Sequence, residues 1–418
     1  MTSRIIEGNF ALPRRYATSA VLFFVLLATW GAINRGKLAG FDLLPMFSFT
    51  ALMHAHSHVA YFGWASLSIM GAIIAHLRDG FGLTAIPNER TISINLMLIV
   101  ATTLAAWAGF TLQGYAPLSI TVSSINVIWW YVFAWILLRA WQQRTRSPDL
   151  PMQYFLAATI FMVVSSVGAW TRAAMIGFQV SDALATDGAV YFYLHTFTEG
   201  WLVLGAMGIV YWLLPRLAGR PVLNERLARV QLGLTVILLL PTFLVELYAD
   251  GLPEPWNYIG GIFQILMTIP NVLFVYNIVH ALRIRRSQSL VSRFIEWSVL
   301  AFLVKAVFDV ARAFEPVALA LGGRQSVVGY LHLTLLGFVS LVLMAMVYEL
   351  TGQTRDRRAG VWHLALVVAG MWGMILALFA AGGGPLVGIQ GQGVFRFWMW
   401  LALGFAYVTA FAVYLFAW

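Results

Sequence analysis

The chain has 418 residues, of which 61% are hydrophobic and 10% are charged, and its mean hydropathy is +0.81. This composition lies far outside the range of soluble domains and indicates an integral membrane protein. Cysteine is absent, which excludes disulfides, thiolate-bound metals and cysteine nucleophiles. The net charge of +9 comes from basic residues in short gaps between apolar runs, where they set topology rather than bind nucleic acid.

Apolar runs long enough to cross a bilayer as a helix, about 20 residues each, predict an all-α protein with about twelve transmembrane helices. The runs begin near Tyr16, His54, Ile92, Leu118, Tyr154, Ala189, Leu227, Trp256, Phe294, Val327, Val361 and Phe395. The first run follows Arg14 and Arg15 and lacks a small-residue cleavage site, so a retained span is expected rather than a removed signal peptide. We therefore expect a single membrane domain over residues 1–418.

The distribution of charge between the runs predicts the orientation. Most of the 26 Lys and Arg residues lie in the N-terminal tail and in the gaps after even-numbered runs, for example Arg144, Arg220 and Arg293. The gaps after odd-numbered runs carry acidic residues such as Asp42 and Glu254. Under the positive-inside rule, both termini should face the cytoplasm, in a multi-pass protein of the cytoplasmic membrane.

Three histidines mark an internal repeat. His58, His195 and His332 are evenly spaced, since 195 − 58 and 332 − 195 both give 137. Each is followed at the fifth position by glycine, at the ninth by leucine and at the twelfth by methionine. The pattern predicts three four-helix units in a pseudo-threefold arrangement, with one histidine near the non-cytoplasmic end of the second helix of each unit. The expected units are about 1–150, 151–290 and 291–418.

The second run carries two further histidines. His54 and His58 are four residues apart and share a helical face, whereas His56 points roughly the opposite way. One or two of the three can therefore meet one cofactor held between helices. A single intramembrane histidine is often only hydrogen-bonded to a neighbour, but three in register favour a cofactor.

Two glutamates lie inside apolar runs, where a carboxylate needs a partner. Glu199 follows His195 by four residues on the same face, and Glu246 lies in the middle of the seventh run. His195, Glu199 and Glu246 together are a nitrogen and oxygen set suited to iron or another first-row metal. The alternative, given equal weight, is a pair of proton-carrying or hydrogen-bonded carboxyl groups.

The ninth run has a polar face of its own. Lys305 and Asp309 are four apart and are expected to pair, with Arg312 on the same face. Elsewhere, Arg396 and Arg324 are candidates for contacting the carboxylates of a cofactor near the outer face.

With these motifs, the chain resembles the catalytic subunit of heme–copper oxidases and nitric oxide reductases. The sixth run, YFYLHTFTEGWLVLGAMGIVYWLLPRLAGRPV, resembles that family's sixth helix, and the spacing of His195, Glu199 and Gly200 resembles the nitric oxide reductase version. The tenth run, GYLHLTLLGFVSLVLMAMVYEL, resembles a segment with two histidines; His332 keeps the position that binds a low-spin heme, while Tyr330 stands where the ligand of the high-spin heme would be.

The resemblance implies a set of cofactors. It pairs His332 with a histidine of the second run as axial ligands of one heme b, where the internal register favours His58 and the family's longer spacing favours His54. A Pro-Glu-x-Trp turn is matched by Pro253 to Trp256, and counting back places Val245 and Glu246 where the family has two metal histidines. The two metal histidines are missing, and so is the high-spin heme histidine that Tyr330 replaces. One heme is therefore expected rather than two. Non-heme iron or copper would have to bind at His195, Glu199 and Glu246.

Three functions are compatible with these features. The first is a heme-containing oxidoreductase of the nitric oxide reductase or terminal oxidase type, taking electrons from a separate cytochrome c-type subunit or a quinone and acting on a small gas. The second is a non-catalytic electron-transfer or sensor subunit with one heme. The third is a twelve-helix secondary transporter, which the division of the chain into three disfavours because such transporters commonly repeat in halves.

Overall fold

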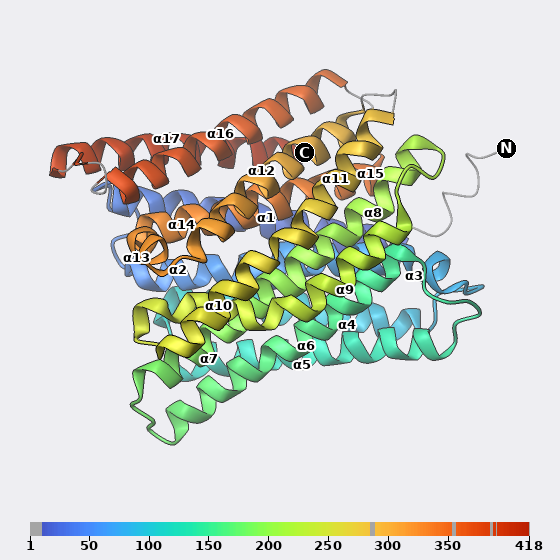
Figure 1. The fold of residues 1–418 in the computed structure, drawn as a ribbon, viewed down its shortest axis with the longest axis horizontal. Coiled ribbons are helices and arrows are strands. Elements are labelled where there is room, and N and C mark those ends of the chain that lie inside the picture. Colours follow the sequence, from blue (N-terminus) through green and yellow to red (C-terminus); the bar gives the residue numbers. More distant parts are fainter. Residues whose placement is uncertain (1–10, 285–288, 353–356, 385–387, 390, 418) are drawn as a thin grey trace. The chain divides into compact units, whose positions relative to one another are not determined.

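The computed structural model describes residues 11–284, 289–352, 357–384, 388–389 and 391–417. Within these ranges the regular elements are helices and no β-strand occurs, as predicted (Figure 1). Eleven of the helical segments are long and apolar enough to cross a membrane. The predicted span near Phe294 forms helix α12 (Leu290–Arg312), which carries charges such as Lys305 and Asp309 and is not among these eleven. The multi-pass helical prediction is confirmed, and the number twelve stays a prediction.

The chain divides into two compact units. The first comprises Met1–Pro148, Leu343–Ala381 and Gly388–Trp418, and the second comprises Asp149–Val342 and Gly382–Val387. The first division falls close to the predicted repeat boundary at residue 150. The prediction of a single domain with three repeat units stays a prediction.

The first unit is built on helices from both ends of the chain, and α1 packs against α3 and α17 within it. Its core includes the stacked rings of Phe24 and Trp64, whose centroids lie 4.1 Å apart. Its helices are α1 (Ala11–Leu38), α2 (Phe49–His58), η1 (Val59–Ala65), α3 (Ser66–Phe81), α4 (Glu89–Gln113), α5 (Pro117–Gln142), most of α15 (Leu341–Thr351) and of α16 (Arg357–Gly383), and α17 (Gln392–Ala417).

The second unit holds the middle of the chain, and α6 packs against α7, η2 and α8 within it. Side chains such as Trp201 and Phe197 are fully buried there. Its helices are α6 (Leu150–Gly177), α7 (Ala183–His195), η2 (Thr196–Val203), α8 (Leu204–Ala218), α9 (Glu225–Thr242), η3 (Phe243–Asp250), α10 (Glu254–Leu266), α11 (Thr268–Ile284), α12, α13 (Glu315–Leu321), α14 (Arg324–His332) and η4 (Leu333–Ser340).

The backbone conformation repeats with the sequence. A π-helical segment begins immediately after each of His58, His195 and His332, namely η1, η2 and η4. A π-helical turn has a wider hydrogen-bonded ring than an α-helical one, and such turns occur frequently at functional sites. The equal spacing of the three histidines therefore corresponds to an equal local structure, which the sequence pattern alone did not predict.

A tyrosine and a glycine form a second repeated contact. A Cβ atom added at Gly71 in α3 would lie 2.9 Å from the Cβ of Tyr16, and one added at Gly208 in α8 would lie 3.1 Å from the Cβ of Tyr154. Both tyrosines are fully buried, and each donates its hydroxyl hydrogen to a main-chain carbonyl, of α4 and of α9 respectively. Glycine at these positions lets α3 approach α1 closely in the first unit, and α8 approach α6 closely in the second.

Candidate functional site

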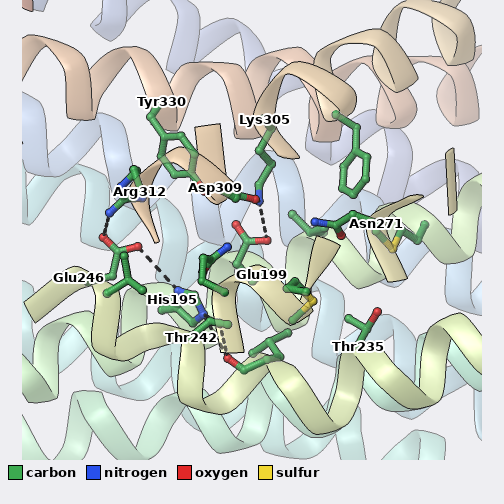
Figure 2. A pocket seen from close by; sticks show the side chains of 17 residues that line it. His195, Glu199, Thr235, Thr242, Glu246, Asn271, Lys305, Asp309, Arg312 and Tyr330 are labelled. Carbon is green, nitrogen blue, oxygen red and sulfur yellow. Dashed lines mark hydrogen bonds and ion pairs between the residues drawn. The ribbon is translucent and has the colours of Figure 1, made fainter. Parts of the chain in front are cut away.

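A polar pocket lies inside the second unit, between α7, η2, α9, η3, α12 and α14 (Figure 2). It combines the carboxylates of the sixth and seventh predicted spans with the polar face of the ninth. Its polar lining is His195, Glu199, Thr235, Thr242, Glu246, Gln264, Asn271, Lys305, Asp309, Arg312 and Tyr330. Apolar side chains such as Met207 and Phe302 complete the wall.

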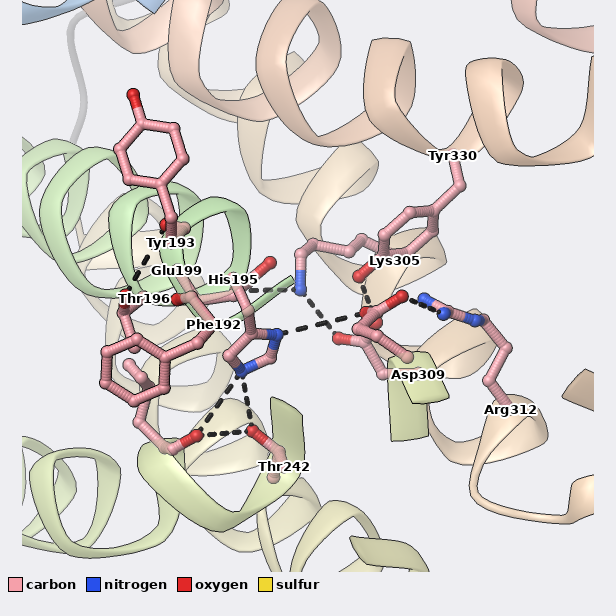
Figure 3. Close-up of polar contacts among 12 residues, drawn as sticks. Phe192, Tyr193, His195, Thr196, Glu199, Thr242, Lys305, Asp309, Arg312 and Tyr330 are labelled. Atoms are coloured by element: carbon pink, nitrogen blue, oxygen red, sulfur yellow. Dashed lines mark hydrogen bonds and ion pairs between the residues drawn. The ribbon is translucent and has the colours of Figure 1, made fainter. Parts of the chain in front are cut away.

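Lys305 is the centre of one half of the pocket. Its side chain is buried, and its Nζ lies 2.7 Å from Asp309 Oδ2 and 3.0 Å from Glu199 Oε2. The predicted pair of Lys305 and Asp309 is thus confirmed, and it is extended to a carboxylate on η2. Tyr330 of α14 donates its hydroxyl hydrogen to Asp309 Oδ1 at 2.6 Å (Figure 3). The buried ammonium group and its carboxylates thus join α12 to η2, and the hydroxyl of Tyr330 adds α14.

Arg312 is the centre of the other half. Its Nη2 donates to Glu246 Oε2 at 2.5 Å, and the other oxygen of Glu246, Oε1, lies 3.8 Å from Nδ1 of His195. The second ring nitrogen, Nε2, lies 2.8 Å from the hydroxyl of Thr242 and 3.3 Å from the carbonyl oxygen of Leu239 (Figure 3). Because the Thr242 hydroxyl itself donates to that carbonyl, its oxygen accepts from His195, and Nε2 carries the hydrogen.

The three side chains that the sequence suggests for a non-heme metal are therefore in one pocket, but their donor atoms are engaged by other groups. Nε2 of His195 donates to Thr242 and its Nδ1 faces Glu246, while Glu199 faces an ammonium group and Glu246 a guanidinium group. In the part of the chain that the structure describes, no group of three or more His, Cys, Asp or Glu side chains is arranged to hold a metal ion. In this arrangement the residues do not fit a metal.

The histidines of α2 belong to the first unit and differ in their surroundings. The Nδ1 of His58 is hydrogen-bonded to the carbonyl oxygen of His54 at 2.8 Å, and its ring stacks on Phe110 of α4 with centroids 3.9 Å apart. His56 instead points to α1, where its Nδ1 lies 3.0 Å from the carbonyl oxygen of Leu27. The helical periodicity predicts this opposite direction. His58 is thus fixed in orientation by its own helix.

His332 in the second unit has the same local geometry as His58. Its Nδ1 lies 2.7 Å from the carbonyl oxygen of Val328, one helical turn earlier. A carbonyl bonded to Nδ1 requires the hydrogen on that nitrogen and leaves the lone pair on Nε2, which is the tautomer that binds a metal through Nε2. His58 and His332 therefore each present Nε2 in the form that binds a metal, whereas His195 presents Nδ1.

The two arginines suggested for cofactor carboxylates lie at helix starts. Arg396 is exposed near the beginning of α17, and Arg324 is exposed at the first residue of α14. Their role stays a prediction. The Pro-Glu-x-Trp turn immediately precedes and begins α10, with Pro253 as its N-cap residue.

The two contacts that join the pocket, Lys305 with Glu199 and Arg312 with Glu246, were not predicted from the sequence. The signal was present in the composition of the spans. Two carboxylates inside apolar runs each need a partner, and the polar face of α12 offers two cations, seven residues apart, on either side of Asp309. The sequence marks Tyr330 only as the replacement of a histidine, and its hydrogen bond to Asp309 was not expected.

Comparison with known proteins gives a consistent result. The family model of cytochrome c and quinol oxidase polypeptide I matches residues 12–408. Cytochrome c oxidase subunit 1 of Thermus thermophilus is 23% identical over 296 residues, covering 62% of this chain and 52% of the relative. A nitric oxide reductase subunit of Stutzerimonas stutzeri is 28% identical over 211 residues, covering 46% of this chain and 44% of the relative. The chain thus spans about half the length of these two relatives.

A longer match is found with the Cbb3-type cytochrome c oxidase subunit CcoN1 of Stutzerimonas stutzeri, which is 22% identical over 388 residues, covering 84% of this chain and 78% of the relative. Among solved structures, a heme–copper terminal oxidase dimer matches with a TM-score of 0.82 at 16% identity, over 97% of this chain and 82% of the other. The fold of the solved structure is therefore shared along nearly the whole chain.

Proposed function

The chain belongs to the family of cytochrome c and quinol oxidase polypeptide I, and on that premise we propose that it is a membrane electron-transfer protein with one low-spin heme b. In this proposal His58 and His332 would hold the heme iron. The observation that carries it is their common hydrogen bond from Nδ1 to the carbonyl oxygen one turn earlier, which presents Nε2 in the form that binds iron.

The choice of His58 over His54 rests on three shared features. His58 and His332 have the same place in the 137-residue register, are both followed by a π-helical segment, and have the same Nδ1 hydrogen bond. The His54 ring instead lies edge-on to Tyr115, with centroids 4.4 Å apart, and its carbonyl supports His58. In this proposal His58 is the ligand, and the main-chain carbonyl of His54 positions its ring.

A bis-histidine heme, when bound, supplies one-electron transfer and leaves no coordination position open for a small gas. The chain's own residues would hold the two imidazoles in orientation, because a ring bonded at Nδ1 cannot rotate without losing that bond. Stacking of His58 on Phe110 restricts the ring further. These contacts favour a carrier of electrons over an enzyme that reduces nitric oxide or oxygen.

The partners and location in this proposal follow from the family and from charge. Electrons would come from a separate cytochrome c-type subunit or a membrane quinone, since these 418 residues contain no cysteine for covalent heme attachment. The charge distribution supports a bacterial cytoplasmic membrane location with both termini on the cytoplasmic side. Arg396 and Arg324 remain the proposed contacts of the heme carboxylates.

The heme content of the purified protein tests the proposal. The full chain would be purified in detergent and its heme measured as the pyridine hemochrome, against protein determined by amino-acid analysis. The proposal predicts one heme b per chain, and the His332→Ala variant should lose it while remaining folded by circular dichroism. A purified chain without heme would contradict the proposal and favour the transporter hypothesis.

A further inference from the structure

The pocket of the second unit brings two side-chain cations to the carboxylates that the sequence suggests as metal ligands. Lys305 lies 3.0 Å from Glu199, and Arg312 lies 2.5 Å from Glu246. Both cations come from α12, while the carboxylates come from η2 and η3 (Figure 2). The contacts therefore hold three separate helices together within one unit.

Lys305 and Arg312 supply the positive charge beside Glu199 and Glu246 that a metal ion would otherwise supply. A buried carboxylate requires a compensating positive charge, and a metal ion and a side-chain cation are alternative ways to provide it. With Lys305 and Arg312 in place, a divalent ion beside Glu199 and Glu246 would meet two like charges in a region of low dielectric. The cations thus exclude the ion from the same carboxylates that would bind it.

His195 faces the same carboxylate as Arg312. Its Nε2 donates to Thr242, so the neutral ring has its lone pair on Nδ1, which points to Glu246 from 3.8 Å. A histidine that binds a metal requires an unprotonated nitrogen facing the ion and a hydrogen-bond acceptor on the other nitrogen. His195 meets this requirement with Thr242 on Nε2 and with Nδ1 toward the pocket, so the two side-chain cations are what keep an ion from Glu246.

We propose that Lys305 and Arg312 take the place of a metal ion in this pocket, neutralising Glu199 and Glu246 and tying α12 to η2 and η3. The second unit is then complete without a non-heme metal. It also follows that the pocket contains a latent cation site: removal of the two side-chain cations exposes Glu199, Glu246 and Asp309 as oxygen ligands, with Nδ1 of His195 beside them. Such a set suits a first-row divalent metal.

The test measures metal and heme on the same sample. The full chain, purified in detergent, would be incubated with Fe²⁺ or Zn²⁺ under anaerobic conditions, desalted, and analysed by mass spectrometry for metals and as the pyridine hemochrome for heme. Non-heme metal is the total minus heme iron. The wild type should retain no stoichiometric non-heme metal, and the double variant Lys305→Ala, Arg312→Ala should retain about one equivalent. The matched control Arg229→Ala, which removes an exposed cation paired with Glu225 on α9, should behave as the wild type.

Two results would overturn the proposal. One is a wild type that retains an equivalent of non-heme metal. The other is a folded double variant that takes up none. If the double variant does not fold, the milder Lys305→Met variant serves instead, and added Zn²⁺ should raise its melting temperature but leave that of the wild type unchanged; no difference between the two would count against the proposal. Because heme is counted separately, these outcomes do not depend on whether heme is present.

Discussion

Lys305 and Glu199 are bonded at 3.0 Å although they come from different helices, and the lysine side chain is only 4% exposed. An isolated ammonium group is very unfavourable inside a protein, so its position is determined by the carboxylates around it. This contact connects the histidine-bearing helix to the polar face of α12. It therefore explains why α12 can carry charges while packing among apolar spans.

Removing the ammonium group should strongly destabilise the fold. Lys305→Met leaves Glu199 and Asp309 without their cation, and loss of one partner of a buried ion pair costs about 3–5 kcal/mol. Thermal or denaturant unfolding in detergent measures the change. The exposed control Arg229→Ala should change stability by less than about 1 kcal/mol. Adding Glu199→Gln and Asp309→Asn to Lys305→Met should recover part of the loss, and a triple variant no more stable than the single one would argue against the ion pairs.

The hydroxyl of Tyr330 contributes separately to the pocket. Tyr330→Phe removes the 2.6 Å hydrogen bond to Asp309, and a bond to a charged group is worth about 1.5–3 kcal/mol. The matched control is Tyr276→Phe on α11, whose side chain is exposed, and its unfolding midpoint should stay unchanged. Equal midpoints for the two variants would show that the Tyr330 bond is not formed.

Gly63 and Gly200 follow two of the repeat histidines at the fifth position, and a phenylalanine packs on each. Neither glycine should tolerate a side chain. A Cβ atom added at Gly200 would lie 2.5 Å from the Cβ of Phe161, and Gly63 is in the same situation with Phe23. Gly200→Ala should therefore destabilise the protein by about 1–3 kcal/mol. Gly233→Ala on α9 has open space and should be neutral or stabilising by up to about 1 kcal/mol. Unfolding curves of the two variants make the comparison, which fails if Gly200→Ala is as stable as the wild type.

The histidines of α2 can be separated by spectroscopy. His58→Ala should abolish the low-spin heme spectrum, because it removes the proposed ligand. His54→Ala keeps the main-chain carbonyl that bonds Nδ1 of His58, so its spectrum should stay close to that of the wild type. Absorbance spectra of the reduced proteins, normalised to protein, provide the readout. The opposite result, with heme lost only in His54→Ala, would move the ligand to His54.

The apolar runs predict the helices well because the length and hydrophobicity of a span are local properties. The pairing of Lys305 with Asp309 was predictable for the same reason, since a spacing of four residues brings both to one face. The contacts of Lys305 with Glu199 and of Arg312 with Glu246 depend on how separate helices rotate and pack, which periodicity does not fix. The π-helical segments after the repeat histidines likewise arise from an extra residue in one turn, and no residue type marks it.

The proposal that His58 and His332 together hold one heme iron can be tested with carbon monoxide, which binds only where a coordination position is open. The spectrum of the dithionite-reduced protein would be recorded before and after saturation with carbon monoxide. A six-coordinate heme held by His58 and His332 predicts one heme b spectrum that carbon monoxide leaves unchanged. A shifted spectrum with the shape of a carbon monoxide complex would reveal an open coordination position and contradict the binding of heme by both histidines.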